Sequence, residues 1–436
     1  MVFIITLIFG PLLSFSQSLD QDLSFYIQQM NLRPLSSPPP KREALYQLGL
    51  RLFYDRQLSG NENISCHSCH SLTGFSGDTL PLAVGEGAEG LASLRTQSAG
   101  MLIPRHTPPL YNLGLEGIKN FFWDGRVSFH HQGGWQTPED GLNGPNPELK
   151  SMAQTLDSLL ATQALFPMAS PEEMLGKGSK LSRLEAWQNI MTRLLSGRLG
   201  ASYRRFFKEA FPNTENFNIA HAANAIAELE RHHFLANNTL WDIYLLGKKT
   251  ILSDRMKRGA IIFLSKGSCT NCHSGDHFSS FGFQNIGIPQ IGPGLTNQDD
   301  RGRMEVTLAE THKYRFRVSP LRNIGLTAPY MHSGVFKNMW EVIDHYNHPM
   351  RSLHHFKWDE NHVSYNEPLV LDQRPETMSE RTKNLASNLP RNLNLQAEEK
   401  IDLYCFLMVA LTDLRNQKDL FTKGVLDEIT DCSPRI

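Results

Sequence analysis

The chain of 436 residues has almost no net charge and, beyond its first residues, no long apolar run. Its 43 Lys and Arg residues are matched by 44 Asp and Glu residues, so its formal charge at pH 7 is -1. A charge this small excludes a general electrostatic attraction for nucleic acid or for an anionic membrane. After residue 16 no apolar stretch comes near the ~18 residues of a membrane-spanning helix. We therefore expect neither a nucleic-acid-binding protein nor a membrane-spanning one.

The first 16 residues are the exception, because they read MVFIITLIFGPLLSFS and end in small residues before a polar segment. This pattern is typical of a secretory signal peptide, although the segment contains no Lys or Arg at its start. We expect residues 1–17 to be a signal peptide and the mature protein to be periplasmic. No Cys follows the apolar run directly, which argues against a lipid anchor at that place.

Cysteine is also scarce, yet four of the six cysteines fall in two copies of the pattern C-x-x-C-H. The two copies are Cys66-His67-Ser68-Cys69-His70 and Cys269-Thr270-Asn271-Cys272-His273. Each copy supplies two thiols that can form thioethers with haem vinyl groups and an adjacent imidazole that can bind the iron. A thioredoxin-like redox pair or a zinc site is disfavoured, because no βαβ context surrounds either motif and each motif includes the His. The pattern predicts two covalently attached haem c groups, with His70 and His273 as the proximal iron ligands.

The remaining cysteines, Cys405 and Cys432, leave two interpretations open. In an oxidising compartment they can form a disulfide with each other. Alternatively, Cys405 is a core residue, since it lies in the apolar helical pattern LYCFLMVAL.

Local patterns predict a mostly α-helical protein with long Gly- and Pro-rich loops. Related segments precede the two haem motifs, namely GLRLF at 49–53 and GAIIF at 259–263. This weak internal repeat indicates two similar cofactor domains. We expect an N-terminal domain at 18–215 and a C-terminal domain at 216–436.

Two stretches lack helical periodicity. Residues 74–147 are dense in Gly and Pro, so we expect loops that wrap over a haem face rather than a sheet. The polar stretch at about 348–392 is expected to be an irregular surface insertion.

Two haems in one chain fit either an electron carrier or an enzyme, and the sixth iron ligand distinguishes the two. A carrier keeps both irons six-coordinate with strong ligands. A peroxidase leaves one iron open to its substrate and surrounds it with groups that move protons.

Further motifs narrow this choice. They are Leu58-Ser59, GFSGD at 74–78, PPLYN at 108–112, FWDGR at 122–126, YLLG at 244–247, PLRN at 320–323 and APYMHSG at 328–334. On these motifs, the chain from about residue 42 to its final helix resembles the bacterial di-haem cytochrome c peroxidase family, which includes the MauG-type enzymes. The resemblance implies two c-type cytochrome-like helical domains with one haem each. It also implies that peroxide reacts at the N-terminal haem, while the C-terminal haem passes electrons or stores oxidising equivalents.

The resemblance also implies roles for individual side chains. Trp123 of FWDGR matches the tryptophan that lies between the haems in the family. Trp123 and Gln132 are both expected to be catalytic residues. Tyr346 aligns with the sixth ligand of the second haem, where the peroxidases have Met and the MauG-type enzymes have Tyr. His345 is the competing ligand, but neighbouring residues of a helix point about 100° apart, so only one of them can face the iron.

Glu173 is the expected proton shuttle for peroxide cleavage, because Pro167 and Glu173-Met174 match the family's P-x5-E-M motif. The same residues fit a second interpretation, a helix-capping box written SPEE at 170–173. Glu148 is the alternative acid–base group.

Two departures from the family pattern have consequences. The tripeptide Gly85-Glu86-Gly87 stands where peroxidases that need reductive activation have a distal His, so we expect the first iron to be open to peroxide. The pair Arg105-His106 stands where the family has the Asn that binds calcium, and a hard cation prefers oxygen to imidazole. We therefore expect calcium binding to be weak or absent.

The leading hypothesis is a cytochrome c peroxidase, an oxidoreductase that reduces hydrogen peroxide at the N-terminal haem. Its electrons would come from a small c-type cytochrome or a cupredoxin and pass through the C-terminal haem. The alternatives are a MauG-like oxidase of Trp or Tyr on a partner protein and a non-enzymatic di-haem electron carrier. An open first iron disfavours the carrier. The resemblance also allows a homodimer.

Overall fold

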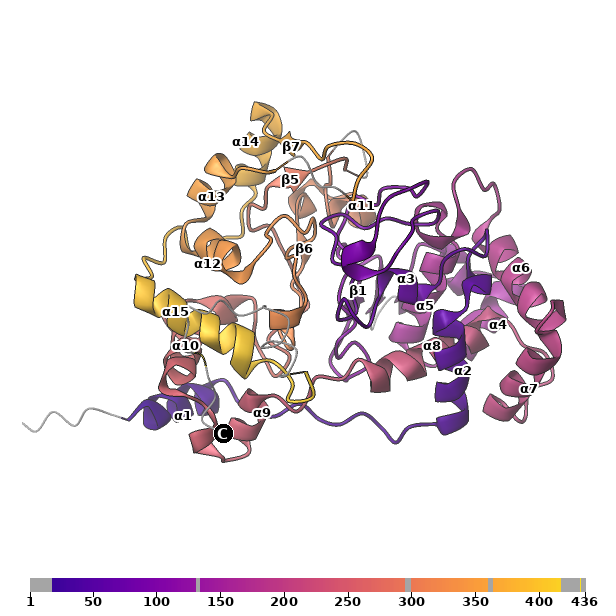
Figure 1. Cartoon of the computed structure of the whole chain (residues 1–436), viewed down its shortest axis with the longest axis horizontal. Helices are drawn as coiled ribbons and strands as arrows, with labels where there is room; N and C mark the ends of the chain where they lie inside the picture. The colour runs from indigo at the N-terminus through magenta and orange to yellow at the C-terminus, as the bar shows by residue number, and fades with distance from the viewer. Residues whose placement is uncertain (1–17, 131–133, 295–298, 360–363, 417–431, 433–436) are drawn as a thin grey trace, which may run out of the picture.

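The computed structural model describes residues 18–130, 134–294, 299–359, 364–416 and 432, and it is mostly helical with few strands (Figure 1). The α-helices are α1 (Leu19–Gln29), α2 (Glu43–Tyr54), α3 (Cys66–Cys69), α4 (Pro147–Thr155), α5 (Leu159–Met168), α6 (Arg183–Ser196), α7 (Gly200–Ala210), α8 (Ile219–His233), α9 (Leu240–Leu245), α10 (Asp254–Leu264), α11 (Met304–Thr307), α12 (Met339–Asn347), α13 (Pro349–His355), α14 (Pro375–Lys383) and α15 (Ala397–Cys405). The strands are β1 (Asn120–Phe121), β2 (Val127–His130), β3 (Gly134–Gln136), β4 (Phe283–Gln284), β5 (Gln290–Ile291), β6 (Phe316–Arg317) and β7 (Leu371–Asp372). Within these residues no helix is long and apolar enough to cross a membrane.

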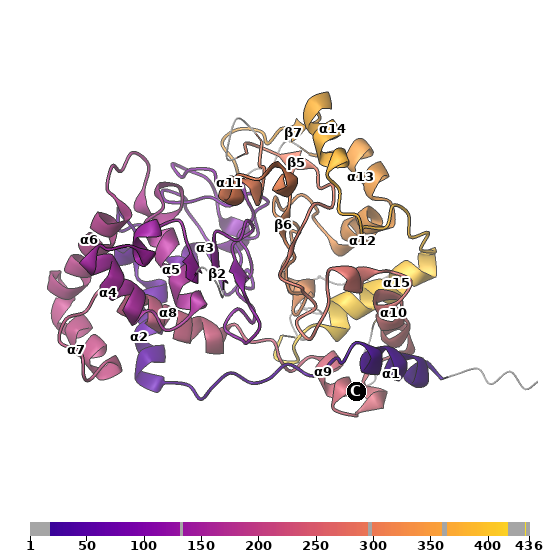
Figure 2. The same cartoon turned by 180° about the vertical axis from the view of Figure 1, so that it is seen from behind.

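The buried apolar side chains form two large cores, one in each half of the molecule (Figures 1 and 2). The N-terminal core is built mainly on α2, α5, α6 and α8. The C-terminal core is built on α10, α12 and α15, and α1 packs against α10. Both views show the halves side by side, with irregular loops from each half between them. Each half therefore contains its own core and one C-x-x-C-H motif.

The division between the halves lies further along the chain than the expected boundary at 215/216. Helix α8 belongs to the N-terminal core, because its buried face from Ile219 to Leu229 packs against α2 and α5. Helix α1, expected in the N-terminal domain, instead packs in the C-terminal half, where Leu23 lies in the core. An extended segment then leads from α1 to α2 along the bottom of Figure 1. A helix joins the core that its apolar face contacts, whatever its place in the chain.

The similar segments before the two motifs form equivalent helix crossings. Gly49 on α2 lies against α8, where an added Cβ would be 1.9 Å from the carbonyl oxygen of Ala225. Gly259 on α10 lies against α15 in the same way, because an added Cβ would be 1.9 Å from the carbonyl oxygen of Asp402. Glycine at these positions lets the two helices approach more closely than any side chain permits. The internal repeat thus corresponds to a helix pair that leads the chain into each C-x-x-C-H motif.

The expectation that 74–147 contains no sheet is wrong for part of this stretch. Strands β1, β2 and β3 form a three-stranded antiparallel sheet in that order, in which Phe121 pairs with Val127. Strands of two to four residues carry too little periodicity to be recognised among glycines. The remainder of the stretch is largely irregular, as expected.

The stretch 348–392 is more regular than expected. It contains α13, β7 and α14, and β7 pairs with β5. Arg381 on α14 is nearly inaccessible to solvent and forms ion pairs with Asp299 and Asp372. The β5–β7 pairing and the Arg381–Asp299 ion pair join residues far apart in the chain, so the local sequence gives no sign of them.

A disulfide joins Cys405, at the end of α15, to Cys432, with the two Cα atoms 5.2 Å apart. Cys405 is also fully buried in the C-terminal core. Both interpretations of this residue therefore hold, since it is bridged and it packs in the core. The disulfide is the kind of crosslink that persists in an oxidising compartment.

Replacing Gly259 by Ala should destabilise the protein by about 1–3 kcal/mol, because the new methyl group would overlap the backbone of α15. Guanidinium unfolding of the haem-loaded protein, followed by circular dichroism, measures this. Gly282→Ala is the control, since its added Cβ would meet only the Ser280 hydroxyl at 3.4 Å. An unchanged free energy of unfolding in Gly259→Ala would contradict the close helix crossing.

Candidate functional site

The first C-x-x-C-H motif lies on the short helix α3, with Cys66 and Cys69 at its two ends and partly buried. The His70 imidazole follows directly, and its Nδ1 lies 2.9 Å from the carbonyl oxygen of Ser76. Because this contact makes Nδ1 the donor, Nε2 is left as the nitrogen that can bind a metal. Burial lowers the pKa of His70 to about 4, which keeps the imidazole in its neutral, metal-binding form.

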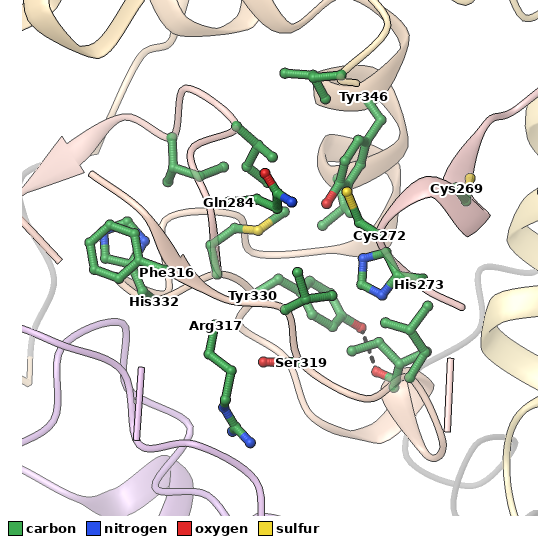
Figure 3. A pocket seen from close by; sticks show the side chains of 18 of the residues that line it. Cys269, Cys272, His273, Gln284, Phe316, Arg317, Ser319, Tyr330, His332 and Tyr346 are labelled. Carbon is green, nitrogen blue, oxygen red and sulfur yellow. Dashed lines mark hydrogen bonds between the residues drawn. The ribbon is translucent and has the colours of Figure 1, made fainter. Parts of the chain in front are cut away.

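The second motif repeats this geometry at Cys269, Cys272 and His273. The His273 Nδ1 lies 2.9 Å from the carbonyl oxygen of Phe278, so its Nε2 is again left to bind a metal. All three residues line one cavity, which is walled by β6, the loop before α12, and α12 itself (Figure 3). Two similar cofactor sites therefore lie in the two halves, as the paired motifs predict.

Buried polar atoms near both motifs suit a cofactor with carboxylate groups. In the wall of the second cavity, Arg317 Nε and Ser319 Oγ have no hydrogen-bond partner within the described structure. Near the first motif, Arg95 is buried with Nη2 3.5 Å from Cys69 Sγ, and its Nε also lacks a partner among the described residues. A buried guanidinium is costly unless an anion pairs with it. The residues at both sites thus fit haem c, a cofactor that carries negatively charged groups.

Tyr346, and not His345, faces the cavity of the second motif. Figure 3 shows the Tyr346 side chain pointing into this cavity on the side of Cys272. His345 is fully buried, with Nδ1 2.9 Å from Ser352 Oγ and Nε2 2.9 Å from the carbonyl oxygen of Ile286. Because both of its ring nitrogens are engaged, His345 has none to offer an iron. Of the two expected candidates, only Tyr346 is placed to become a sixth ligand.

Trp123 lies where the two halves meet. Its indole Nε1 donates to the carbonyl oxygen of His106 at 2.7 Å, and its own carbonyl accepts from the Arg317 N–H at 2.8 Å. Arg317 belongs to β6 in the C-terminal half, so this contact joins the halves at Trp123. The side chain is only 8% exposed and lines the cavity of the second motif. The structure therefore brings the sequence-predicted tryptophan to the second site.

A buried ion-pair cluster beside Trp123 spans the same interface. Arg105 Nη1 lies 2.6 Å from Asp124 in the N-terminal half, and Arg105 Nε and Nη2 lie 2.7 and 2.8 Å from Asp300 in the C-terminal half. Burial by itself lowers the pKa of Arg105, but the two carboxylates outweigh it and raise that pKa, so the guanidinium stays charged. This charged contact ties the halves together next to the tryptophan.

Glu173 is held near the first motif by its neighbours. Arg126 Nη2 lies 3.0 Å from Glu173 Oε1, while Oε2 is buried without a hydrogen-bond partner in the described part of the chain. Burial, with smaller contributions from the Glu172 and Asp124 carboxylates, raises the pKa of Glu173 against the opposing effect of Arg126. Burial and nearby carboxylates, Glu173 among them, also raise the pKa of the Cys69 thiol to about 11.

The capping interpretation of Glu173 holds only for its backbone. Ser170 Oγ accepts from the Glu173 N–H at 3.3 Å, at the start of the π-helical turn η4 (Pro171–Leu175). The Glu173 side chain does not return the bond and instead contacts Arg126. The backbone N–H of Glu173 thus takes part in capping the turn, and its carboxyl group does not.

Other sequence-predicted residues lie elsewhere. Glu148 is exposed and bonded to Gln188, away from both motifs, which removes it as the alternative acid. Glu86 is buried, but its side chain accepts a hydrogen bond from Asn63 and its N–H donates to the Glu173 carbonyl at 2.8 Å. It therefore supports the backbone of Glu173. Gln132 lies outside the described residues.

Sequence reasoning missed the partners of two of these side chains. In the sequence, Arg105 was notable only because it departs from the calcium motif. The sequence around Asp300 does not indicate that Asp300 pairs with Arg105. Arg126 was noticed only as part of FWDGR, whereas it links Asp124 to Glu173 in space. The one available signal was the unusual charge of FWDGR, which holds an acid and a base two residues apart.

Comparison with known proteins agrees with this geometry. A family model described as di-haem cytochrome c peroxidase matches residues 43–250. The methylamine utilization protein MauG of Methylorubrum extorquens is 29% identical over 357 residues, which cover 80% of this chain and 79% of that protein. The cytochrome c551 peroxidase of Pseudomonas aeruginosa is 27% identical over 309 residues, which cover 70% of this chain and 71% of that protein.

Solved structures show the same fold. A MauG-like protein associated with microbial copper homeostasis superposes with a TM-score of 0.60 and 26% identity, over 88% of this chain and 94% of that one. The diheme peroxidase BthA from Burkholderia thailandensis superposes with a TM-score of 0.56 and 20% identity, over 88% of each chain. With both haem motifs in place, the chain is similar in sequence and fold to the di-haem cytochrome c peroxidases and MauG, and the peroxidases among these relatives are oxidoreductases that act on peroxide.

Proposed function

We propose that the protein is a periplasmic di-haem peroxidase in which each half is a c-type cytochrome-like domain with one haem c. Hydrogen peroxide is reduced at the N-terminal site with electrons relayed through the C-terminal site. The observation that carries this proposal is Glu173, a partly buried side chain whose Oε2 is buried without a hydrogen-bond partner in the described structure, close to the first motif. Haem bound through His70 would supply the iron at which peroxide is reduced. An electron carrier has no use for a buried acid–base group at that place.

Glu173 is placed to move protons between the two peroxide oxygens. Reduction of hydrogen peroxide to water breaks the O–O bond and consumes two electrons and two protons. Glu173 Oε2 takes the proton from one peroxide oxygen and gives it to the other peroxide oxygen, which then leaves as water. Arg126 holds the other carboxyl oxygen at 3.0 Å, so the proton-accepting oxygen keeps one direction. Because the pKa of Glu173 is raised, it is closer to the pKa that a general acid–base group needs near neutral pH.

Trp123 is proposed to carry single electrons from the second site to the first. Its ring lines the second cavity, and its hydrogen bond to the His106 carbonyl fixes the ring plane. The neighbouring Arg105 contacts carboxylates of both halves, so the separation of the two sites is held constant around the tryptophan. In this role Arg105 is a positioning residue.

A second candidate function is a MauG-like oxidase that uses peroxide to oxidise Trp or Tyr residues of a partner protein. The observation that favours it is Tyr346, which faces the second cavity in place of a thioether side chain. An anionic phenolate stabilises oxidised iron over reduced iron, which suits storage of an oxidising equivalent. In the first function the partner is a small c-type cytochrome or a cupredoxin, and in the second it is the oxidised protein.

Calcium has no part in the proposal. The buried Arg105 guanidinium, together with Arg126, already balances the charges of Asp124 and Asp300 where the halves meet. A divalent cation at the same carboxylates would have to displace this buried cation and leave it without a counter-charge.

The intact mass of the mature protein should exceed that of the polypeptide by two haem groups, because each C-x-x-C-H motif supplies both thioether sulfurs. Replacing Cys269 and Cys272 together by Ala should remove one haem from this mass and leave the N-terminal haem in place. A wild-type mass with a single haem, or with zinc, would contradict the proposed cofactors.

Glu173→Gln should slow the reaction with peroxide by roughly a hundredfold or more, as expected for loss of a general acid–base group. Stopped-flow oxidation of reduced cytochrome c measures this rate. In the wild type the rate should fall as the pH drops through the raised pKa of Glu173, because the carboxylate form accepts the proton. The variant should lack this dependence.

The neighbouring Glu172→Gln is the matched control, since Glu172 is exposed and contacts only Ser170 by hydrogen bond among the described residues. It should react with peroxide at the wild-type rate above the pKa of Glu173, because losing the Glu172 carboxylate only lowers that pKa. If Glu173→Gln loses only thermal stability, by about 1 kcal/mol, then Glu173 acts as a helix cap alone.

Tyr346→Phe should abolish the tyrosinate signature of the second haem in optical and electron paramagnetic resonance spectra, because the variant lacks the phenolate oxygen. Tyr330→Phe provides a control, since Tyr330 lines the same cavity but donates its hydroxyl hydrogen to the Ile324 carbonyl at 3.1 Å. Unchanged spectra in Tyr346→Phe would exclude this ligand and weaken the MauG-like function.

A further inference from the structure

A cluster of aromatic rings lies behind the second motif. Phe263 lines the cavity, and its ring centroid is 6.5 Å from that of His273. Phe278 and Phe406 pack on Phe263 at 5.4 and 5.5 Å. Trp241 on α9 packs on both of these rings, at 5.9 Å from Phe278 and 5.4 Å from Phe406. Two layers of phenylalanine, first Phe278 with Phe406 and then Phe263, therefore separate this buried indole from the cofactor site.

Trp241 stacks on a second oxidisable ring. Tyr244 follows it by three residues on α9, which places both on one face of the helix. Their ring centroids are 5.9 Å apart with an interplanar angle of 13°. Both side chains are at most 1% exposed, so the pair is shielded from water. Unlike phenylalanine, tryptophan and tyrosine lose an electron readily, and the pair extends the route outward from the site.

The Tyr244 hydroxyl donates a hydrogen bond to a carboxylate that is partly exposed to solvent. It donates to Asp20 Oδ1 at 2.7 Å, and the other oxygen of Asp20 accepts from Lys257 at 2.9 Å. Asp20 lies on α1, which packs beside α10 near α9 (Figures 1 and 2), and its side chain is 38% exposed. Burial raises the pKa of Asp20, but the bonds from Lys257 and Tyr244 outweigh this and lower it, so Asp20 is ionised.

The charge around Tyr244 couples electron loss to proton loss. The Lys249 ammonium lies 4.0 Å from the Tyr244 ring centroid, and a nearby cation opposes the formation of a cationic ring. Oxidation of Tyr244 is therefore favourable only if the phenol proton leaves with the electron. Asp20 is the carboxylate in position to take that proton.

We propose that Trp241, Tyr244 and Asp20 form a relay through which oxidising equivalents leave the second cofactor site for the surface beside α1. Trp241 gives one electron to the peroxide-oxidised site and recovers it from Tyr244. Tyr244 at the same time passes its phenol proton to Asp20. The result is a neutral tyrosyl radical at Tyr244 and a protonated carboxyl group at Asp20. A one-electron donor at the surface then returns the electron to Tyr244, and Asp20 returns the proton. This relay rests on the proposed function, because peroxide supplies the oxidant.

The relay is tested with the haem-loaded protein, mixed with hydrogen peroxide in the absence of any donor and frozen for electron paramagnetic resonance. The wild type should show a tyrosyl radical, and Tyr244→Phe should lack it while the stacked ring is kept. Asp20→Asn should slow the decay of the peroxide-oxidised optical spectrum by about a hundredfold, the usual contribution of a positioned proton acceptor. Peptide mapping after excess peroxide should find more oxygen added to Trp241 in Tyr244→Phe, because the oxidising equivalent then stops at the indole.

Tyr404→Phe is the matched control, since Tyr404 is another buried tyrosine of the same core, stacked on Trp340 at 4.2 Å. It should keep both the radical and the wild-type decay. Loss of the radical in this variant, and not in Tyr244→Phe, would overturn the proposed route. A normal optical reaction with peroxide, but equal decay in the wild type, Tyr244→Phe and Asp20→Asn, would overturn the relay alone. The absence of any optical change in the wild type would overturn the peroxidase function and the relay with it.

Discussion

The position of every proposed reacting group in the N-terminal half depends on one buried cation, the guanidinium of Arg105. It contacts Asp124 from its own half and Asp300 from the other. Asp124 also pairs with Arg126, which in turn holds Glu173. The residue after Arg105, His106, supplies the carbonyl that fixes the Trp123 indole. Removing one partner of such a buried cluster leaves an uncompensated charge, at a cost of about 3–5 kcal/mol, so the site and the interface between the halves are held together.

Away from this cluster the two halves repeat one construction. In each, a glycine-bearing helix crosses its partner at backbone distance, and the imidazole after the second cysteine donates to a nearby carbonyl. The halves differ in the side chain that is proposed to act beside each cofactor. The N-terminal half presents a carboxyl group held by a guanidinium, whereas the C-terminal half presents a phenol. The proposed division between proton transfer and electron storage therefore depends on the turn η4 and on helix α12, and not on the repeated helices.

Much of the site could be predicted from the sequence, because its chemistry is concentrated in short segments. A C-x-x-C-H motif places both sulfurs and the imidazole within five residues, and any fold that accommodates it brings them together. The helical class followed from periodic apolar residues in long segments. Trp123 and Tyr346 were found through motifs of this kind, and the structure places both at the second cavity. The short strands, the helices of 348–392 and the place of α1 were not foreseen, since each depends on pairing with distant residues.

The sequence by itself thus predicted which cofactor the chain attaches, and at which cysteines and histidines, and it determined that the chain is mostly helical. Only the tertiary structure decided between neighbouring or competing side chains. His345 is excluded because Ser352 and the Ile286 carbonyl occupy its two nitrogens. Glu173 is preferred to Glu148 because Glu173 is partly buried, with Oε2 inaccessible to solvent near the first motif, whereas Glu148 is exposed. Such choices depend on burial and on contacts between residues far apart in the chain, and neither leaves a periodic or local trace in the sequence.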